Sequence, residues 1–168
     1  MLLVRPNHQL KDKIISFKND FTMNDEKIIN GSELLDKMDS FDEWLEYVSN
    51  NASIDTLSED WVLTDIYFAI VGEKIVGVIC LRHYLNDFLF DFGHIAYSVC
   101  PSERRRGYAT KMLELVLDNA RDIGMLSVKI STFHDNIASV KAIIKNGGVY
   151  DYDFIYEDNI VDVYLIKL

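Results

Sequence analysis

The chain has 168 residues, with 49% hydrophobic and 26% charged residues, which are the proportions of one ordinary globular domain. It carries 17 basic and 27 acidic residues, a formal net charge of −10, which disfavours nucleic acid as a partner. No apolar run approaches the roughly 20 residues of a membrane span, and charges interrupt the N-terminus, so neither a membrane partner nor a signal peptide is expected.

In chain order, residues 1–5 predict a short strand. A helix is expected after Pro6, because apolar residues recur at helical spacing from Leu10 to Phe17. A second helical region is expected over about 32–50. Within it, Ser40 and Glu43 form a capping box that starts a new helix. The polar stretch 51–60 predicts a loop.

Residues 61–71 and 74–82 are rich in β-branched and aromatic residues, which favours two strands. Only Gly72 and Glu73 separate them, and this spacing is typical of a tight hairpin. A longer connection follows over 83–92. Residues 93–99 predict the next strand.

The clearest helix is expected over 107–123, where apolar residues line one face and Gly124 provides a C-terminal stop. Residues 126–132 alternate as a strand, and Asn136 then caps a helix whose inward residues are expected to be Val140, Ile143 and Ile144. Residues 149–156 and 160–168 complete the chain as a hairpin of two strands.

The strand–helix–strand order over 93–132 requires a crossover between parallel strands, whereas the hairpins are antiparallel. We therefore expect a single α/β domain over residues 1–168, with a mixed, mostly antiparallel sheet and helices on both faces. Cys80 and Cys100 lie in apolar runs and do not make a disulfide framework. They predict reduced, buried thiols and a cytoplasmic location.

Three consecutive arginines precede the clearest helix, at Arg104, Arg105 and Arg106. Positive side chains oppose the helix dipole at this end, unless an anion binds there. The first N–H groups of a helix have no internal partner, and Gly107 and Ala109 let a ligand approach the backbone closely. The run therefore predicts a polyphosphate site. The alternative is a solvated turn with surface arginines.

The sequence of this turn, RRRGYA, resembles the R/Q-x-x-G-x-G/A signature of the GNAT superfamily of acetyl-CoA-dependent N-acetyltransferases. The order of strand, turn, helix and strand, and Asn136-Ile-Ala-Ser139 before a helix, match the family over about residues 62–150. The string GHIAYSVCPSERRRGYAT is also similar to a bacterial GNAT subgroup of unassigned substrate. The resemblance implies a twisted sheet whose central parallel strand pair is splayed around the cofactor.

The resemblance further implies that acetyl-CoA is the cofactor, that no metal is needed, and that the turn holds its pyrophosphate. It implies that a backbone N–H near Val99 donates to the oxyanion formed during acetyl transfer. Asn136 would hydrogen-bond the pantetheine arm, cap its helix, or do both. The expected cofactor-binding residues are Val99, Arg104, Arg105, Arg106, Gly107, Tyr108, Ala109, Thr110, Asn136 and Ser139.

An attacking amine must be neutral, so a general base is expected. His94 is the first candidate because histidine titrates near pH 6.5, although a hydrogen-bonded core histidine is the alternative. Asp91, His83 and Asp87 are rival candidates. Strand alternation places His94, Ala96 and Ser98 on one face of this strand and Ile95, Tyr97 and Val99 on the other. Either face could meet the substrate, and a β-bulge would exchange the two faces.

One position departs from the family pattern. Many GNAT enzymes carry a tyrosine seven residues after the motif asparagine, which reprotonates the departing thiolate, and here that position is Ile143. The proton then comes from elsewhere or from water. The expected reaction is acetyl transfer to a primary amine of a small molecule or peptide, by direct attack in a ternary complex.

The alternative function is a catalytically degenerate domain that binds acyl-CoA as a sensor or interaction module. Residues 1–60 hold 13 acidic and 6 basic residues, which favours a cationic acceptor such as a polyamine, an aminoglycoside or a lysine. The resemblance also allows a homodimer.

Overall fold

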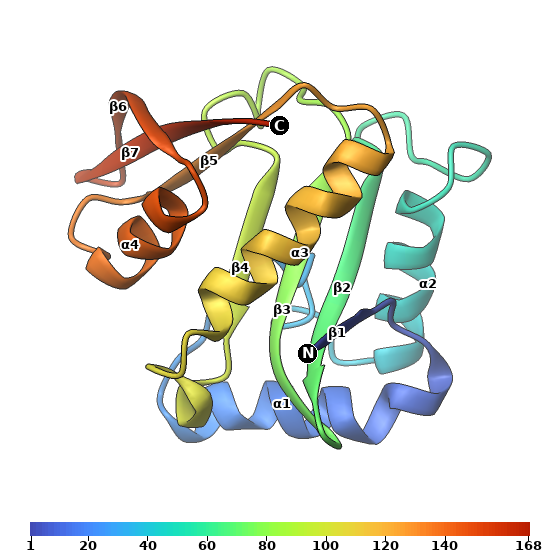
Figure 1. Ribbon diagram of the computed structural model, residues 1–168. Coiled ribbons are helices and arrows are strands. Elements are labelled where there is room, and N and C mark those ends of the chain that lie inside the picture. The colour runs from blue at the N-terminus through green and yellow to red at the C-terminus, as the bar shows by residue number, and fades with distance from the viewer.

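The long hairpin β2–β3 organises the first half of the protein, shown as a computed structural model that describes all 168 residues (Figure 1). β2 (Thr64–Val71) and β3 (Lys74–Arg82) are antiparallel, and Gly72 turns between them at a φ of 60°. β1 (Leu2–Val4) extends the sheet beyond β2, and β4 (Ile95–Val99) extends it beyond β3. All three pairings in this four-stranded sheet are antiparallel.

Helices cover both faces of this sheet. α1 (Lys11–Met23), which follows the short 3-10 turn His8–Leu10, and α2 (Phe41–Asn51) cover one face. Their apolar sides enclose a core centred on Trp44 and Phe68, both fully buried. α3 (Tyr108–Asp122) crosses the opposite face, following the 3-10 turn Pro101–Glu103.

A second sheet, in the order β5-β7-β6, stands beside the first. β5 (Ser127–Phe133) enters it directly after α3, and β6 (Val149–Tyr156) and β7 (Asn159–Lys167) form the C-terminal hairpin. α4 (Ile137–Lys145) lies against this sheet and faces α3. The core beneath α3 continues through the second sheet as far as Tyr164 and Ile166.

The two sheets meet at the start of β4, and β4 and β5 then separate. Gly93 forms an isolated bridge with Ile130, and the His94 N–H donates to the Lys129 carbonyl at 2.8 Å. Gly93 has a φ of 85°, and a Cβ there would lie 2.5 Å from the Lys129 oxygen, so glycine is needed for the contact. β4 and β5 run away from this junction in different directions (Figure 1).

The predicted α/β fold is confirmed, and every predicted strand is present. The single mixed sheet expected from the sequence is instead two sheets, and every strand pairing within them is antiparallel. The helix expected over about 32–50 is wrong in its first part, because the chain becomes helical only at Phe41. Gly31, Glu33 and Leu34 all have positive φ values, which a helix excludes. The inward orientation expected for Ile144 is also wrong, since that side chain is 55% exposed and Ala142 is buried instead.

Candidate active site

The turn before α3 presents a run of unpaired backbone donors. Gly107 is the N-cap of α3, with a φ of 78°, and no side chain caps the helix. The first helical bond is from Lys111 to the Gly107 oxygen, and no N–H from Arg105 to Thr110 has an acceptor within the protein. Together with the positive end of the helix dipole, this makes a cradle suited to an anion. We call residues 105–110 the cradle.

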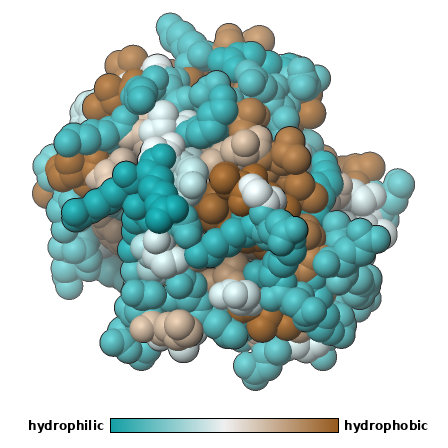
Figure 2. Space-filling model, turned by 60° about the horizontal axis from the view of Figure 1, so that its bottom comes forward, coloured by the Kyte–Doolittle hydropathy of each residue, from teal (hydrophilic) through white to brown (hydrophobic).

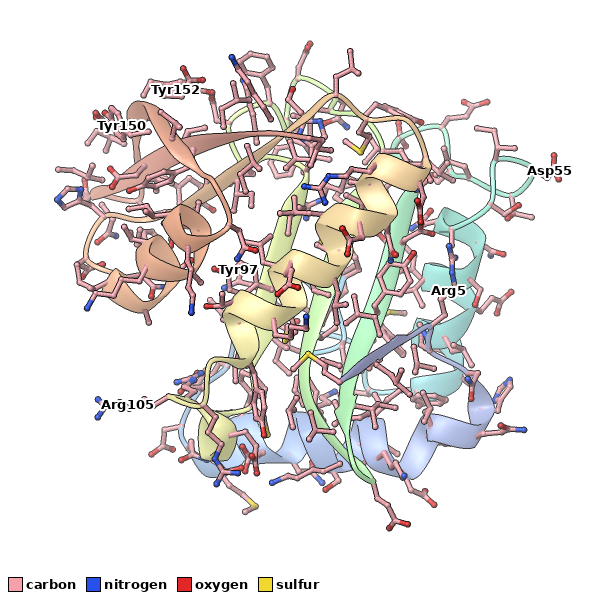
Figure 3. The ribbon with its side chains drawn as sticks, in the orientation of Figure 1. Arg5, Asp55, Tyr97, Arg105, Tyr150 and Tyr152 are labelled. Carbon is pink, nitrogen blue, oxygen red and sulfur yellow. The ribbon has the colours of Figure 1, made fainter.

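The three arginines differ in what they contact. Arg104 makes a bidentate ion pair with Glu26, at 2.6 and 2.7 Å, and its Nε donates to the Val99 carbonyl at 3.2 Å. Arg106 pairs with Glu103 at 2.8 Å. Arg105 is exposed, has no carboxylate partner, and points outward from the start of α3 (Figure 3). Of the three, Arg105 is therefore free to meet a ligand without breaking an ion pair.

The first residues of the cradle, Arg105, Arg106 and Gly107, are exposed. Hydrophilic residues cover most of the face seen when the bottom of the molecule comes forward, with apolar atoms exposed between them (Figure 2). A Cβ added at Gly107 would have no heavy atom within 4 Å. An anion can therefore reach the backbone of the cradle from solvent.

β4 has one free edge. The Arg82 N–H donates to the His94 carbonyl, and the Cys100 N–H donates to the Val76 carbonyl. These two bonds fix which alternate residues of β4 hydrogen-bond to β3. In that alternation Ala96 and Ser98 bond to β3, while the N–H groups of Tyr97 and Val99 point away from it. No strand pairs with them there. The predicted oxyanion donor at Val99 thus lies on this free edge, and its role stays a prediction.

The register between β3 and β4 is regular, so no bulge exchanges the two faces of β4. Tyr97 and Val99 pack against the core beneath α3, whereas Ala96 packs against the core beneath α1 and α2. Gly31 lies against the Ala96 side, where an added Cβ would be 2.2 Å from the Ala96 oxygen. The segment between α1 and α2 therefore forms the wall of β4 opposite α4.

His94 holds the junction of the two sheets. Its Nδ1 accepts a hydrogen bond from the Lys129 N–H at 2.9 Å, and its own N–H donates to the Lys129 carbonyl. Burial, reinforced by the charges of Lys129 and Arg82, lowers the pKa of His94 to about 4. The ring is therefore neutral at pH 7, with its proton on Nε2 and its one lone pair already used. This geometry favours a holding role over that of a base.

The rival bases are not brought together. Asp91 Oδ1 accepts from the Tyr152 hydroxyl at 2.8 Å, and His83 Nε2 lies 3.0 Å from the buried Asp65 carboxylate. Asp87 is exposed on the loop before β4. Of these residues, Asp91 is nearest along the chain to the junction at His94.

The start of α4 lies beside β4. Asn136 caps α4 by accepting from the Ser139 N–H at 3.2 Å, and its amide NH₂ has no partner within the protein. The Ser139 hydroxyl lies 2.8 Å from the hydroxyl of Tyr97 on β4. Ile143 is fully buried beneath α4. Sequence reasoning did not single out Tyr97, although its place on the strand before the arginine turn was visible.

Cys100 lies at the end of β4, where its thiol donates to Asp20 at 2.9 Å. Burial, together with that hydrogen bond, raises its pKa to about 11, so it is a thiol at neutral pH. Both cysteines are free and buried. The His, Cys, Asp and Glu side chains form no group of three or more that could hold a metal ion. None of the helices has the length and hydropathy of a membrane span.

The sequence matches the model of the acetyltransferase (GNAT) domain over residues 9–149. The chain belongs to the GNAT acetyltransferase family. The resemblance noted in the turn before α3 is thereby confirmed, and so is the prediction of an acetyltransferase. No curated protein sequence matches the chain significantly.

Solved structures of GNAT proteins share the whole fold. A GNAT acetyltransferase from Streptococcus pneumoniae superposes with a TM-score of 0.72 at 15% identity, covering 99% of this chain and 98% of its own. The yncA protein of Salmonella typhimurium, solved with its cofactor acetyl-CoA, gives 0.70 at 13% identity, with coverages of 99% and 93%. A variant of the spermidine N-acetyltransferase SpeG from Vibrio cholerae gives 0.69 at 15% identity, with coverages of 99% and 95%.

Proposed function

We propose that this GNAT protein transfers the acetyl group of acetyl-CoA to a primary amine by direct attack in a ternary complex. The observation that carries the proposal is that the unpaired N–H groups of the cradle follow directly on the strand whose free edge carries the N–H groups of Tyr97 and Val99. The pyrophosphate would accept hydrogen bonds from the unpaired N–H groups between Arg105 and Thr110. The arm of the cofactor would then lie along the free edge of β4, which carries the Val99 N–H.

Two groups beside this path suit the arm and the thioester. The N–H groups on the free edge of β4 can donate to amide or thioester oxygens, and Val99 is our proposed oxyanion donor. The unpaired amide of Asn136 can bond the arm from the α4 side while its oxygen continues to cap the helix. Tyr108, Ala109, Thr110 and Ser139 complete the proposed cofactor site.

Deprotonation of the amine is proposed to occur through Asp91 and a relay of water molecules, because Asp91 precedes β4 and Val99 ends it. Tyr152 occupies one oxygen of Asp91, which leaves the other free to accept a proton. The lone pair of His94 is engaged by Lys129, so the ring is proposed to set the position of the junction.

The acceptor is proposed to be cationic. Gly31 lies on the side of β4 opposite α4, and it belongs to the first 60 residues, which hold 13 acidic and 6 basic residues. Among the similar structures, SpeG is a spermidine N-acetyltransferase, an enzyme with a polycationic acceptor.

The proposal is tested by measuring CoA release with spermidine, kanamycin and a lysine peptide, together with calorimetry of acetyl-CoA binding. Acetyl-CoA binding and steady CoA release with at least one amine are expected. Binding without release across the panel would favour the acyl-CoA-binding module. Absence of acetyl-CoA binding by the folded protein would overturn both functions.

A further inference from the structure

The hydroxyl of Tyr97 bridges the two halves of the protein. Tyr97 belongs to β4 in the first sheet, and its partner Ser139 belongs to the first turns of α4, which lies against the second sheet. The oxygens are 2.8 Å apart. In Figure 3 the Tyr97 side chain lies between the ribbons of β4 and α4. An arm running along the free edge of β4 from the cradle therefore passes this hydroxyl.

The backbone and side chain of Tyr97 meet the same space. Its N–H is on the free edge of β4, two residues before the N–H of Val99. Its ring packs in the core beneath α3, and its hydroxyl reaches α4. A thioester bound by the N–H groups of this edge would thus have its sulfur beside the strand that carries the Tyr97 hydroxyl.

Among the hydrogen-bonded tyrosine hydroxyls of the protein, only that of Tyr97 is paired with a neutral hydroxyl group. Tyr67, Tyr150, Tyr152 and Tyr164 all donate to aspartate carboxylates. A hydroxyl that already donates to a carboxylate has its proton engaged in a charge-assisted hydrogen bond. Tyr97 bonds only to a neutral hydroxyl, which can take either role in the bond, so its proton is available to an incoming anion.

Burial raises the pKa of Tyr97 above its usual range, although the bond to Ser139 opposes the rise. The hydroxyl therefore keeps its proton at neutral pH. That state can donate a proton and cannot act as a base, which restricts Tyr97 to one half of acid–base catalysis.

We propose that Tyr97 protonates the sulfur of coenzyme A as the thioester is cleaved. This assignment rests on the acetyl transfer proposed above. The amine nitrogen forms a bond to the carbonyl carbon, the C–S bond breaks with its electron pair on sulfur, and the Tyr97 O–H proton passes to that sulfur. The resulting tyrosinate recovers a proton, through water, from the nitrogen of the newly formed amide cation. Ser139 is a positioning residue that holds the hydroxyl.

The first test uses binding alone and needs no acceptor. Calorimetry compares CoA with desulfo-CoA, which lacks the sulfur, on the wild type and on Tyr97→Phe. We expect CoA to bind the variant at least threefold more weakly and desulfo-CoA to bind both proteins equally. Equal losses for the two ligands would assign Tyr97 to general packing and overturn the proposal. No binding of either ligand to the wild type would overturn the proposed function, and this assignment with it.

The second test uses turnover with the panel amine that gives the fastest CoA release. Tyr97→Phe is expected to lower kcat by about 10- to 100-fold, at or below the low end of the range for acid–base catalysis, because a thiolate leaves readily. The wild type should lose rate at high pH as Tyr97 ionises, and the variant should lose this alkaline limb. Tyr67→Phe, which removes a half-buried hydroxyl from the same core, is the matched control. This variant should keep the wild-type kcat and the loss of rate at high pH. An unchanged rate and profile in Tyr97→Phe would refute the role of Tyr97 while leaving acetyl transfer intact.

Discussion

His94 and Lys129 are joined by two hydrogen bonds at the point where the two sheets meet. The His94 N–H donates to the Lys129 carbonyl at 2.8 Å, and the Lys129 N–H donates to His94 Nδ1 at 2.9 Å. One residue thus supplies both a backbone donor and a side-chain acceptor to a strand of the other sheet. Beyond this pair and the neighbouring Gly93–Ile130 bridge, β4 and β5 are not paired.

The first prediction concerns stability in mild acid. The pKa of His94 is about 4 in the folded protein and roughly 6.5 when unfolded, so the unfolded chain binds the proton more tightly. The stability that His94 contributes is therefore fully present above about pH 6.5 and is lost as pH falls towards 4. After allowance for its partial exposure, we expect a loss of about 1 kcal/mol, or about 3 °C in Tm, between pH 7 and 5.

His94→Gln keeps a hydrogen-bond acceptor and cannot titrate, so the fall in Tm between pH 7 and 5 should be smaller in this variant. Its kcat should stay within about tenfold of the wild type, since base catalysis typically contributes 10²–10⁴. A loss of a hundredfold or more in kcat, with Tm and acetyl-CoA affinity unchanged, would instead make His94 the general base.

The second prediction concerns the cradle. Gly107→Glu places a carboxylate among the N–H groups that are proposed to bind pyrophosphate, and it should weaken acetyl-CoA binding at least tenfold, about 1.4 kcal/mol. Gly124→Glu is the matched control at the other end of α3. Both glycines have positive φ, at 78° and 84°, and neither has a heavy atom within 4 Å of an added Cβ. Equal affinities for the two folded variants, measured by calorimetry, would remove the cofactor from the cradle.

The third prediction separates two neighbouring arginines. Arg105→Ala should weaken acetyl-CoA binding about fivefold with little change in Tm, because Arg105 contacts no carboxylate in the protein. Arg104→Ala should lower the free energy of unfolding by about 1 kcal/mol, because it loses both Glu26 and the Val99 carbonyl. Calorimetry and denaturant unfolding of both variants check this division. The opposite pattern would mean that Arg104 leaves Glu26 to bind the cofactor.

The fourth prediction concerns Cys100, which lies beside the proposed thioester path. Its pKa of about 11 leaves it protonated at neutral pH, so it is a poor nucleophile. Cys100→Ala should keep most of the turnover. Mass spectrometry of the enzyme after incubation with acetyl-CoA should find no acetyl group on this residue, and a kinetically competent acetyl-Cys100 would show that transfer is not direct.

The fifth prediction concerns the wall opposite α4. In Gly31→Ala the new Cβ would lie 2.2 Å from the Ala96 oxygen, so the segment must shift, at a cost of about 2 kcal/mol or more. Gly72→Ala also has a positive φ, of 60°, but meets no atom within 4 Å, and it should cost about 1 kcal/mol. Denaturant unfolding should therefore place Gly31→Ala as the less stable variant. Equal stabilities of the two variants would mean that the segment around Gly31 can shift at little cost in free energy.

Local patterns predicted the strands and helices well, because their residues carry the information themselves. The two-residue turn at Gly72 and the cap at Asn136 are set by neighbours in the chain, and both are present. The segment 32–40 was wrong because distant groups decide its path. Trp44 Nε1 donates to the carbonyls of Ser32 and Glu33, and Glu33 pairs with Arg82 on β3.

The same distinction applies to the candidate site. The arginine turn and Asn136 were identified from a short motif, and the structure gives the turn its unpaired donors. The ion pair of Arg104 with Glu26 spans 78 positions of sequence, and the contact of Tyr97 with Ser139 spans 42, so no local pattern indicates either. The charge of an arginine can be read from the sequence, but whether a carboxylate already holds it depends on the fold.

The one-sided pairing of β4 should also appear in amide hydrogen exchange. The N–H groups of Ala96 and Ser98 bond to β3, while those of Tyr97 and Val99 have no partner strand. Protection in the free protein should therefore alternate residue by residue along the strand, fast at Tyr97 and Val99 and slow at their neighbours. A molecule bound along the free edge of β4 would slow exchange only at Tyr97 and Val99, so exchange along this strand would report whether a ligand is bound there.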